Sequence, residues 1–489
     1  MVPGTHCRKG KAGHNVPMKG NTGDMQRSQT VSAENCGEAR NDCEKDGEVN
    51  TRDKENERPM LTPESSLQRI RYLAQTEPEL VFTSLAHRID LHLLEESLKS
   101  IRKDAASGVD KVTVRDYVAN LEANLYNLHQ RLRRGQYVAQ PVKRVWIDKE
   151  GGKKRPIGIP VLEDKIVQRA VATILMTIYE VDFYDFSYGF REGRGAHTAI
   201  EAVWQNCQKL NIQWVVDADV SGYFDNISHR LLREFVKRRV NDGGIIRLIG
   251  KWLNAGVMEE EIVTTPSKGT PQGGVISPVL ANVFLHYVLD EWFVKEVRPR
   301  LSGRCFLVRY ADDFIVGFES ERDARRFMEV LPKRFERFEL EIHPEKSKLV
   351  DFRPTGKGEK GDHEKTFDFL GFTHYRGKSR KGNWIVKRKT ISKRMRRFMS
   401  GIWEWCRKNR HKPIAQQHVS LTQKLRGYYQ YYGIIGNYKA LRQVLWWTER
   451  AWQFWLNRRT HKGKMNWEKY KRSILGKMPL PRPRIIHSL

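Results

Sequence analysis

The stretch Phe306-Leu-Val-Arg-Tyr-Ala-Asp-Asp-Phe-Ile-Val-Gly-Phe318 decides the fold, because it places two adjacent carboxylates between two strand-like runs. β-Branched and aromatic residues flank Tyr310-Ala311-Asp312-Asp313 on both sides, which predicts a hairpin with the acidic pair at its turn. Adjacent aspartates in an apolar hairpin repel each other unless a cation neutralises them. Such oxygen ligands suit Mg²⁺, which bridges carboxylates to substrate phosphates. The stretch therefore indicates a two-metal phosphoryl-transfer site, although an isolated Asp-Asp turn would simply be solvated.

A second acidic segment lies upstream, at Trp214-Val-Val-Asp-Ala-Asp-Val220. This segment is typical of a buried strand, and period-two alternation places Asp217 and Asp219 on one face. If the strand pairs with the 306–318 hairpin, Asp219 can face Asp312 and complete the metal site. The alternative is that Asp219 ends the strand and caps a helix that starts near Asn226.

The third motif is Lys268-Gly-Thr-Pro-Gln-Gly-Gly-Val-Ile-Ser-Pro278, whose adjacent glycines let the backbone approach a ligand closely. We expect Gln272 to border a nucleotide, Ser277 to cap a helix and Pro278 to be the first helical residue. The apolar spacing after it predicts one face of an amphipathic helix, formed by Leu280, Val283, Phe284, Tyr287 and Val288.

Composition points to a polyanionic partner. The 489-residue chain has a net charge of +29 and a pI near 9.8, which favours nucleic acid. Its 13 Trp and 17 Tyr are enough for both a core and stacking surfaces. The sequence contains no run of eighteen apolar residues, so it predicts no membrane span. The six cysteines lack Cys-x-x-Cys spacing, which favours free thiols over a zinc site or a disulfide framework.

Four regions follow one another along the chain. Residues 1–60 are poor in bulky apolar side chains and are expected to be a disordered tail. Structure is expected to begin at Thr62-Pro63, and residues 61–209 combine helices with a basic hairpin at 142–160. Apolar residues at helical spacing from Ile166 to Ile178 predict a helix with a core-facing stripe. Residues 210–387 carry the acidic motifs and a predicted helix at 322–338, and the polar stretch 356–365 is expected to be a surface loop. Helical periodicity over 390–411, 414–432 and 437–459 predicts a three-helix unit within residues 388–489.

Seven motifs occur in an order typical of one family: Arg155-Pro-Ile-Gly-Ile-Pro160, Ser187-Tyr-Gly-Phe-Arg191, Asp219-Val-Ser-Gly-Tyr-Phe-Asp-Asn-Ile227, Thr270-Pro-Gln-Gly-Gly274, Tyr310-Ala-Asp-Asp313, Ile342-His-Pro-Glu-Lys-Ser347 and Phe369-Leu-Gly-Phe372. With them the sequence resembles a bacterial group II intron-encoded reverse transcriptase with maturase activity, of the type that lacks an endonuclease. Two C-terminal segments are similar to the maturase region and tail of that family: Leu425-Arg-Gly-Tyr-Tyr-Gln-Tyr-Tyr432 and Pro479-Leu-Pro-Arg-Pro-Arg-Ile-Ile-His487.

The resemblance implies an α+β right-hand polymerase fold. Residues 61–209 would form the fingers with an N-terminal helical extension. Residues 210–387 would form a palm, whose antiparallel sheet carries the carboxylates. Residues 388–489 would form a helical thumb, or maturase domain, with a basic tail.

The resemblance also implies an RNA-directed DNA polymerase in which Asp219, Asp312 and Asp313 are catalytic and bind two Mg²⁺ ions, for which Mn²⁺ can substitute. Asp313 ranks below the other two, because neighbouring side chains at a turn rarely point the same way. Phe224 would exclude a ribose 2′-OH, although from the residues alone it would be assigned to the core. Lys346 is expected to donate a proton to pyrophosphate. The expected nucleotide contacts are Lys143, Lys149, Arg155, Phe224, Gln272 and Lys346.

The implied partners are group II intron RNA, an RNA template, a DNA primer or target, and dNTPs, in a bacterial cytoplasmic ribonucleoprotein and without a membrane. The RNA contacts are expected at Arg394, Arg397, Arg426 and Tyr428, although most aromatics of the helical unit should be core. The sequence leaves both a monomer and a dimer open.

Two other functions remain open from the sequence. One is an RNA-binding splicing maturase with little polymerase activity, and the other is a related reverse transcriptase repurposed for DNA repair or defence. Intact Asp219, Asp312 and Asp313 argue against a decayed polymerase site. The residues after Trp467 are too few for an endonuclease module of the family.

Overall fold

The structure, a computed structural model, describes residues 63–148, 154–259, 262–264, 268–270, 273–354, 365–459 and 464–488. They belong to one compact unit, Leu61–Leu489. The expectations for the tail at 1–60, for Lys149, for Gln272 and for most of the 356–365 loop lie outside the described residues. Within the described part of the chain, no helix is long and apolar enough to cross a membrane.

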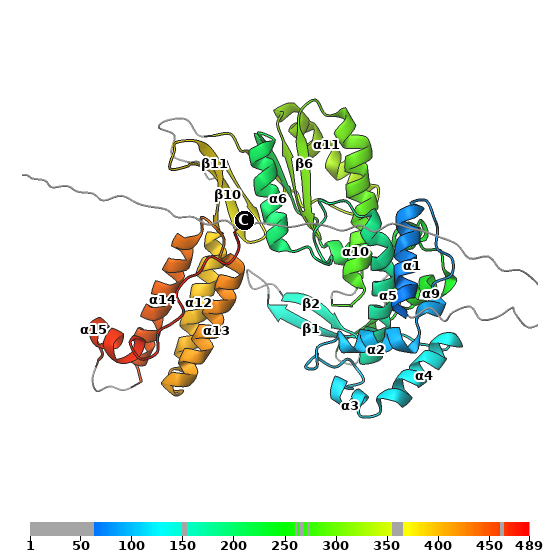
Figure 1. The fold of residues 1–489 in the computed structure, drawn as a ribbon, viewed down its shortest axis with the longest axis horizontal. Helices are drawn as coiled ribbons and strands as arrows, with labels where there is room; N and C mark the ends of the chain where they lie inside the picture. The colour runs from blue at the N-terminus through cyan, green and yellow to red at the C-terminus, as the bar shows by residue number, and fades with distance from the viewer. Residues whose placement is uncertain are drawn as a thin grey trace, which may run out of the picture. The chain divides into compact units, whose positions relative to one another are not determined.

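Helices dominate the first part of the described chain (Figure 1). The long helix α5 (Leu162–Asp182) has the predicted apolar stripe fully buried, from Ile166 to Ile178. The helices that precede it pack around this core and are α1 (Pro63–Thr76), η1 (Ala86–Arg88), α2 (Leu91–Lys99), α3 (Val114–Val118) and α4 (Leu121–Arg133).

The predicted basic hairpin is present, within a larger sheet. Strands β1 (Val142–Asp148) and β2 (Lys154–Ile159) pair antiparallel, with Lys143 opposite Ile159. Two short strands, β4 (Val257–Glu259) and β5 (Ile262–Thr264), extend this sheet in the order β2-β1-β4-β5. Neither was predicted, because three residues are too few to show alternation.

The acidic motifs lie on a four-stranded antiparallel sheet of order β6-β7-β3-β8. The 306–318 hairpin is confirmed, and its second strand pairs with the upstream acidic strand as expected. The bounds are β3 (Trp214–Ala218), β6 (Cys305–Tyr310), β7 (Asp313–Phe318) and β8 (Lys348–Asp351).

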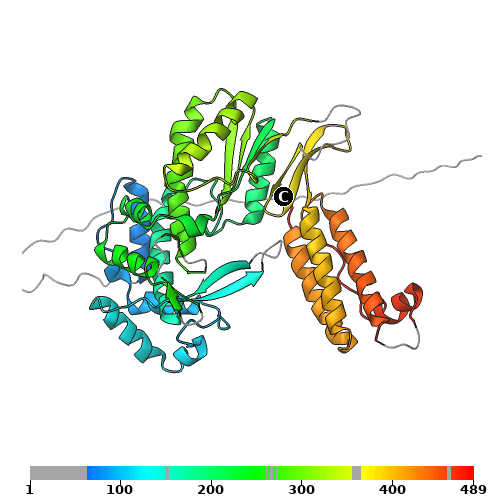
Figure 2. The same ribbon diagram turned by 180° about the vertical axis from the view of Figure 1, so that it is seen from behind.

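Two helices cover opposite faces of this sheet (Figures 1 and 2). Helix α6 (Ala196–Lys209) shares a core with Val215 and Ile315, and α11 (Glu321–Glu336) shares another with Val216 and Val316. The alternation of neighbouring residues between two cores shows that the sheet is buried on both faces. The acidic turn therefore projects from the end of a fully packed layer.

The helices between β3 and β6 add apolar residues to the core that α5 and α11 share. They are α7 (Tyr223–Asn226), α8 (His229–Lys237), α9 (Gly243–Leu253), α10 (Ser277–Leu285), the π-helical segments η3 (His286–Asp290) and η4 (Phe293–Val297), and η5 (Arg298–Arg300). Two expectations for α10 were wrong. Its residues from Val279 to Leu285 are all buried, so it is a core helix without a solvated face. It also begins at Ser277, which places Ile276 at the cap position.

The last third of the described chain contains a small sheet and a helical bundle. The antiparallel strands β9 (Thr366–Phe369), β10 (Phe372–Lys378) and β11 (Trp384–Thr390) were not predicted. The three predicted helices are confirmed as α12 (Ser392–Asn409), α13 (Ile414–Tyr432) and α14 (Tyr438–Leu456), followed by α15 (Trp467–Tyr470) and η7 (Lys471–Leu475). Trp452 is fully buried in the core of this bundle.

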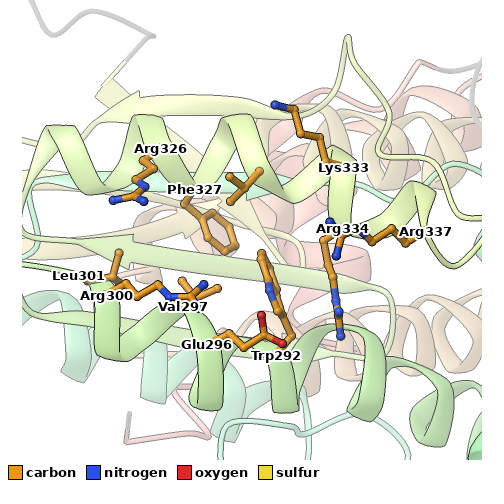
Figure 3. A pocket seen from close by; sticks show the side chains of 11 residues that line it. Trp292, Glu296, Val297, Arg300, Leu301, Arg326, Phe327, Lys333, Arg334 and Arg337 are labelled. Atoms are coloured by element: carbon orange, nitrogen blue, oxygen red, sulfur yellow. The ribbon is translucent and has the colours of Figure 1, made fainter.

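An apolar cavity of about 240 Å³ lies between η4 and α11 (Figure 3). Its floor is a stacked pair, Trp292 and Phe327, with ring centroids 5.8 Å apart. Arg334 lies over the Trp292 ring at 5.6 Å and donates hydrogen bonds to the carbonyls of Tyr287 and Val288. The acidic turn does not line this cavity, which is therefore separate from the carboxylates.

A fully buried ion pair lies next to the acidic turn and forms a hydrogen bond with its backbone. The Arg309 guanidinium donates to both carboxylate oxygens of Asp290, and neither side chain is exposed to solvent. Nη1 of Arg309 also donates to the side-chain oxygen of Asn282 at 2.9 Å and to the carbonyl of Ala311 at 3.1 Å. The buried charge is thereby satisfied, and one of its bonds holds the backbone of the turn.

The segment after Asp185 packs along the outer edge of β6. Ser187 forms a parallel bridge with Arg309, and the amide of Tyr188 donates to the Arg309 carbonyl. A side-chain carbon on Gly189 would lie 2.4 Å from the amide nitrogen of Ala311, so only glycine fits. The side chain of Asn282 donates to the Gly189 carbonyl at 2.7 Å and locks this contact.

Replacement of Arg309 by alanine should lower the free energy of unfolding by about 3–5 kcal/mol, because Asp290 would be left buried without its cation. Arg325→Ala is the control, since Arg325 forms an exposed ion pair with Glu321 and should change stability by less than about 1 kcal/mol. Urea titrations of the two variants measure the difference. A cost for Arg309→Ala as small as that of the control would contradict this role of the ion pair.

Candidate active site

The acidic turn joins β6 to β7 through a short, strained connection. Tyr310 pairs with Asp313, so Ala311 and Asp312 form the tip of the hairpin. Ala311 has a φ of 57°, a left-handed conformation that costs a non-glycine residue about 1–2 kcal/mol. The Arg309 hydrogen bond to its carbonyl and the Gly189 backbone beside its amide hold it there. Strain of this kind is typical of functional turns.

Asp219 reaches the same end of the sheet from β3, although the strand itself ends at Ala218. Its carbonyl accepts from the amide of His343 at 2.8 Å, and its amide donates to the hydroxyl of Ser347 at 3.2 Å. The Ile342–Ser347 motif therefore fixes the backbone of Asp219. Asp217 lies two residues earlier and is partly buried, with Lys348 3.9 Å away.

The three candidate carboxylates act on one another electrostatically. Burial raises the pKa of Asp312, with a further contribution from Asp219 and an opposing one from Arg155. The side chain of Asp313 reaches solvent but has protein around most of it. This burial, followed by the charges of Asp312 and Asp219, raises its pKa to about 6. The structure thus brings Asp219, Asp312 and Asp313 into one site, where their negative charges are unfavourable without a cation.

Cations from separate elements approach these carboxylates. Lys346 donates from Nζ to Oδ2 of Asp219 at 2.5 Å. Arg394, in the first turns of α12, lowers the pKa of Asp313 together with Lys346. Arg155 on β2 acts in the same way on Asp312. The acidic site is therefore bordered by charge from the basic hairpin, the 342–347 loop and the helical bundle.

The donor set suits a hard divalent cation, because it consists of carboxylate oxygens. Among the described residues, no three His, Cys, Asp or Glu side chains already converge on a single point. The carboxylates of Asp219 and Asp312 are nonetheless close enough to shift a pKa. A bound cation would relieve this repulsion, so Asp219, Asp312 and Asp313 are the residues that could hold it.

The other expected nucleotide contacts lie around this site to different degrees. Phe224 is half-buried against Tyr223, and its carbonyl accepts from the amide of Thr270 at 2.7 Å. This bond ties the segment 268–270 to the segment after Asp219. Lys143 is exposed on β1, and Arg155 is exposed on β2.

The expected RNA contacts divide into exposed and buried residues. Arg394, Arg397 and Arg426 are exposed on α12 and α13. Tyr428 is only 5% exposed and packs between Phe398 and Tyr432, with ring centroids 4.4 and 4.5 Å away. The expectation that Tyr428 contacts RNA directly was wrong, because the ring belongs to the core of the bundle.

Sequence reasoning missed the residues that position the turn. Arg309, Asp290 and Asn282 are buried, far apart in the sequence and linked by hydrogen bonds. Asp290 and Asn282 carry no distinctive signal in a run of apolar residues. Arg309 does, because it is a cation inside an otherwise apolar strand directly before the acidic turn.

Comparisons with known proteins agree with this geometry. The family model described as reverse transcriptase (RNA-dependent DNA polymerase) matches residues 147–374. Protein YkfC of Escherichia coli is 36% identical over 284 residues, which cover 52% of this chain and 71% of that protein. The group II intron-encoded protein LtrA of Lactococcus lactis is 38% identical over 207 residues, or 42% of this chain and 32% of LtrA.

A plant relative, the mitochondrial nuclear intron maturase 3 of Arabidopsis thaliana, is 26% identical over 225 residues, which cover 40% of this chain and 31% of the maturase. The chain thus spans most of YkfC but about a third of LtrA and of the maturase. The matched region contains the acidic hairpin, the strand before Asp219 and the 342–347 loop. The chain therefore belongs to the reverse transcriptases of the group II intron type.

Proposed function

We propose that the protein is an RNA-directed DNA polymerase that extends a DNA primer with dNTPs on an RNA template. The observation that carries this proposal is the strained turn that presents Asp312 and Asp313 beside Asp219, bordered by Arg155, Lys346 and Arg394. A polyphosphate and a divalent cation are the ligands that such a mixture of carboxylates and cations fits. Intron RNA is the template implied by the family.

Asp219 and Asp312 would hold Mg²⁺, with Asp313 assisting, and the metal would supply charge stabilisation at the primer 3′-oxygen and the triphosphate. Arg155 approaches the same carboxylates from the hairpin and would bind the triphosphate oxygens. Lys346 is bonded to Asp219 and would hold a proton beside the leaving pyrophosphate. Catalysis would then depend on position and charge in a prearranged site.

We also propose that the protein binds intron RNA and assists splicing and mobility. The net charge of +29 and the exposed arginines of α12 and α13 support this part of the proposal. The second candidate is a maturase with little polymerase activity. The ion pair between Lys346 and Asp219 favours this second candidate, because the lysine would compete with a metal ion for the Asp219 carboxylate.

Primer extension separates the two candidates. Wild type should extend a DNA primer on an RNA template in Mg²⁺, and Asp312→Asn should lose at least about 100-fold in rate, equivalent to about 2.7 kcal/mol. Asp368→Asn is the control, because Asp368 is an exposed carboxylate on β9. RNA binding should survive Asp312→Asn, measured by filter retention. A folded wild type that binds RNA but extends no primer would leave the maturase.

Phe224→Ala should raise incorporation of ribonucleotides relative to deoxynucleotides by about tenfold or more, because the ring would no longer exclude a 2′-OH. Phe224→Tyr keeps the ring and should leave the ratio near that of wild type. Single-nucleotide extension with dNTP and rNTP gives both rates. An unchanged ratio in Phe224→Ala would return this residue to a purely packing role against Tyr223.

Mg²⁺ should raise the thermal unfolding midpoint of wild type by about 2 °C relative to EDTA, because it binds only the folded site. Asp312→Asn should respond less to Mg²⁺. In EDTA this variant should be at least as stable as wild type, since burial disfavours the ionised Asp312. Asp368→Asn should respond like wild type in differential scanning fluorimetry. Equal Mg²⁺ responses in all three proteins would exclude Asp312 as a ligand.

A further inference from the structure

A basic hollow lies at the C-terminal ends of α12 and α14, and we call it the distal hollow. Its volume is about 900 Å³, and six of its nine lining residues are cations. None of the described residues that line it is acidic. The six cations are Arg407, Lys408, Arg410, Arg458, Arg459 and Lys464.

Aromatic rings form one wall of the distal hollow. Phe454 is 37% exposed, and the guanidinium carbon of Arg458 lies 4.4 Å from the centre of its ring. Trp455 lies beside it, within 6.0 Å of the Arg410 guanidinium. The indole N–H of Trp455 is buried and has no hydrogen-bond partner among the described residues. Nucleic-acid bases stack on aromatic rings and on flat guanidinium groups of this kind. Beside them, the Trp455 N–H is a hydrogen-bond donor that no described residue uses.

The distal hollow is far from the carboxylates along the bundle. Helices α12 and α14 run side by side in the same direction, since Met399 contacts Trp447 and Trp403 contacts Phe454. At 1.5 Å per residue, the 13 steps from Arg394 to Arg407 on α12 span about 20 Å. Arg394 near Asp313 and Arg407 in the distal hollow are therefore at opposite ends of one helix.

Helix ends explain only part of this charge. Cations are favourable at a helix C-terminus, and Arg407 also pairs with Glu404 at 3.0 Å. Arg410 donates to the Arg407 carbonyl at 2.8 Å. These contacts do not balance six like charges around one hollow, whose mutual repulsion a bound polyanion would relieve. The cavity between η4 and α11 differs, since its floor is apolar and its cations lie at the rim (Figure 3).

We propose that the distal hollow binds an unpaired RNA strand. Lys408, Arg407 and Arg459 would contact consecutive phosphates, and a base would stack against Phe454 and Arg458. The proposal rests on the proposed function, because RNA is the polyanion that this function supplies. It adds an RNA anchor about 20 Å along the bundle from Arg394, which lies next to the catalytic turn, so that one part of an RNA can be held while another is copied.

Binding of labelled twelve-nucleotide oligo(U) tests the proposal directly. Fluorescence anisotropy would be measured with excess unlabelled primer–template duplex, which fills the polymerase site. Lys408→Ala/Arg459→Ala should weaken binding by about tenfold or more and lower the salt slope by about 1.4. Lys333→Ala/Arg337→Ala is the matched control, because it removes the same charges from the other cavity (Figure 3). Equal losses in the two pairs would overturn the proposal.

Two further arms define the ligand. Phe454→Ala should weaken oligo(U) binding by about fivefold or more, and Phe454→Trp should restore it, because stacking needs a ring. Oligo(dT) or polyglutamate that competes as well as oligo(U) would overturn the assignment to RNA in favour of single-stranded DNA or an acidic protein.

Primer extension on a short duplex separates this proposal from the function on which it rests. Extension should be the same in wild type and in Lys408→Ala/Arg459→Ala, and both proteins should unfold at the same temperature. Wild type that binds oligo(U) through the distal hollow but extends no primer would sink the polymerase alone. Normal extension with unchanged oligo(U) binding in the variants would sink the distal hollow alone.

Discussion

The buried pair of Arg309 and Asp290 is the interaction on which the catalytic end of the sheet depends. Removal of a guanidinium and a carboxylate from water costs several kcal/mol per ion, and attraction repays that cost only where the remaining donors are also satisfied. Here Asn282 and the Ala311 carbonyl accept what Asp290 does not. The pair therefore also fixes the turn. The hydrogen bonds of the buried Arg309 guanidinium are all satisfied only when the Ala311 carbonyl is in its observed position.

This arrangement explains how a strained turn can carry repelling carboxylates. Ala311 remains in a left-handed conformation because its neighbours leave it no relaxed alternative. Asp312 and Asp313 then project from a rigid base, and Asp219 is fixed separately through His343 and Ser347. Rigid positions keep like charges together at a cost in stability, and such a cost is typical of sites that bind cations. The same site lies next to cations from three separate parts of the chain. The electrostatic potential at the carboxylates therefore depends on where those three parts lie.

Local sequence patterns predicted the parts of the fold that are long or strongly periodic. The 306–318 hairpin, the buried stripe of α5 and the three bundle helices all extend over enough residues to show their period. Strands β4 and β5 were missed because each has three residues. The β9–β11 sheet was missed because polar and charged residues, among them His374, Arg388 and Thr390, occupy its buried positions.

The candidate site was predictable as far as single residues carry chemistry. The aspartates were predicted from their place beside apolar strands and Lys346 from the family resemblance, and the structure places Lys346 within hydrogen-bonding distance of Asp219. Tyr428 was misassigned because a tyrosine among arginines is equally typical of a core and of an RNA surface, and only packing distinguishes the two. Asp290 and Asn282 were missed for the opposite reason, since their role exists only through contacts with a distant strand.

The contact between Gly189 and Ala311 also limits how this sequence can drift over evolutionary time. The obstacle to a side chain at position 189 is the backbone of Ala311, so no change of residue at position 311 can make room for it. Position 311 is less restricted, because asparagine, aspartate and glycine also adopt a left-handed conformation. Substitutions are therefore expected at position 311, whereas any side chain at position 189 remains excluded. Glycine would then be retained at position 189 even in a descendant protein that had lost its substrate, because the backbone of the turn leaves no room for a side chain there.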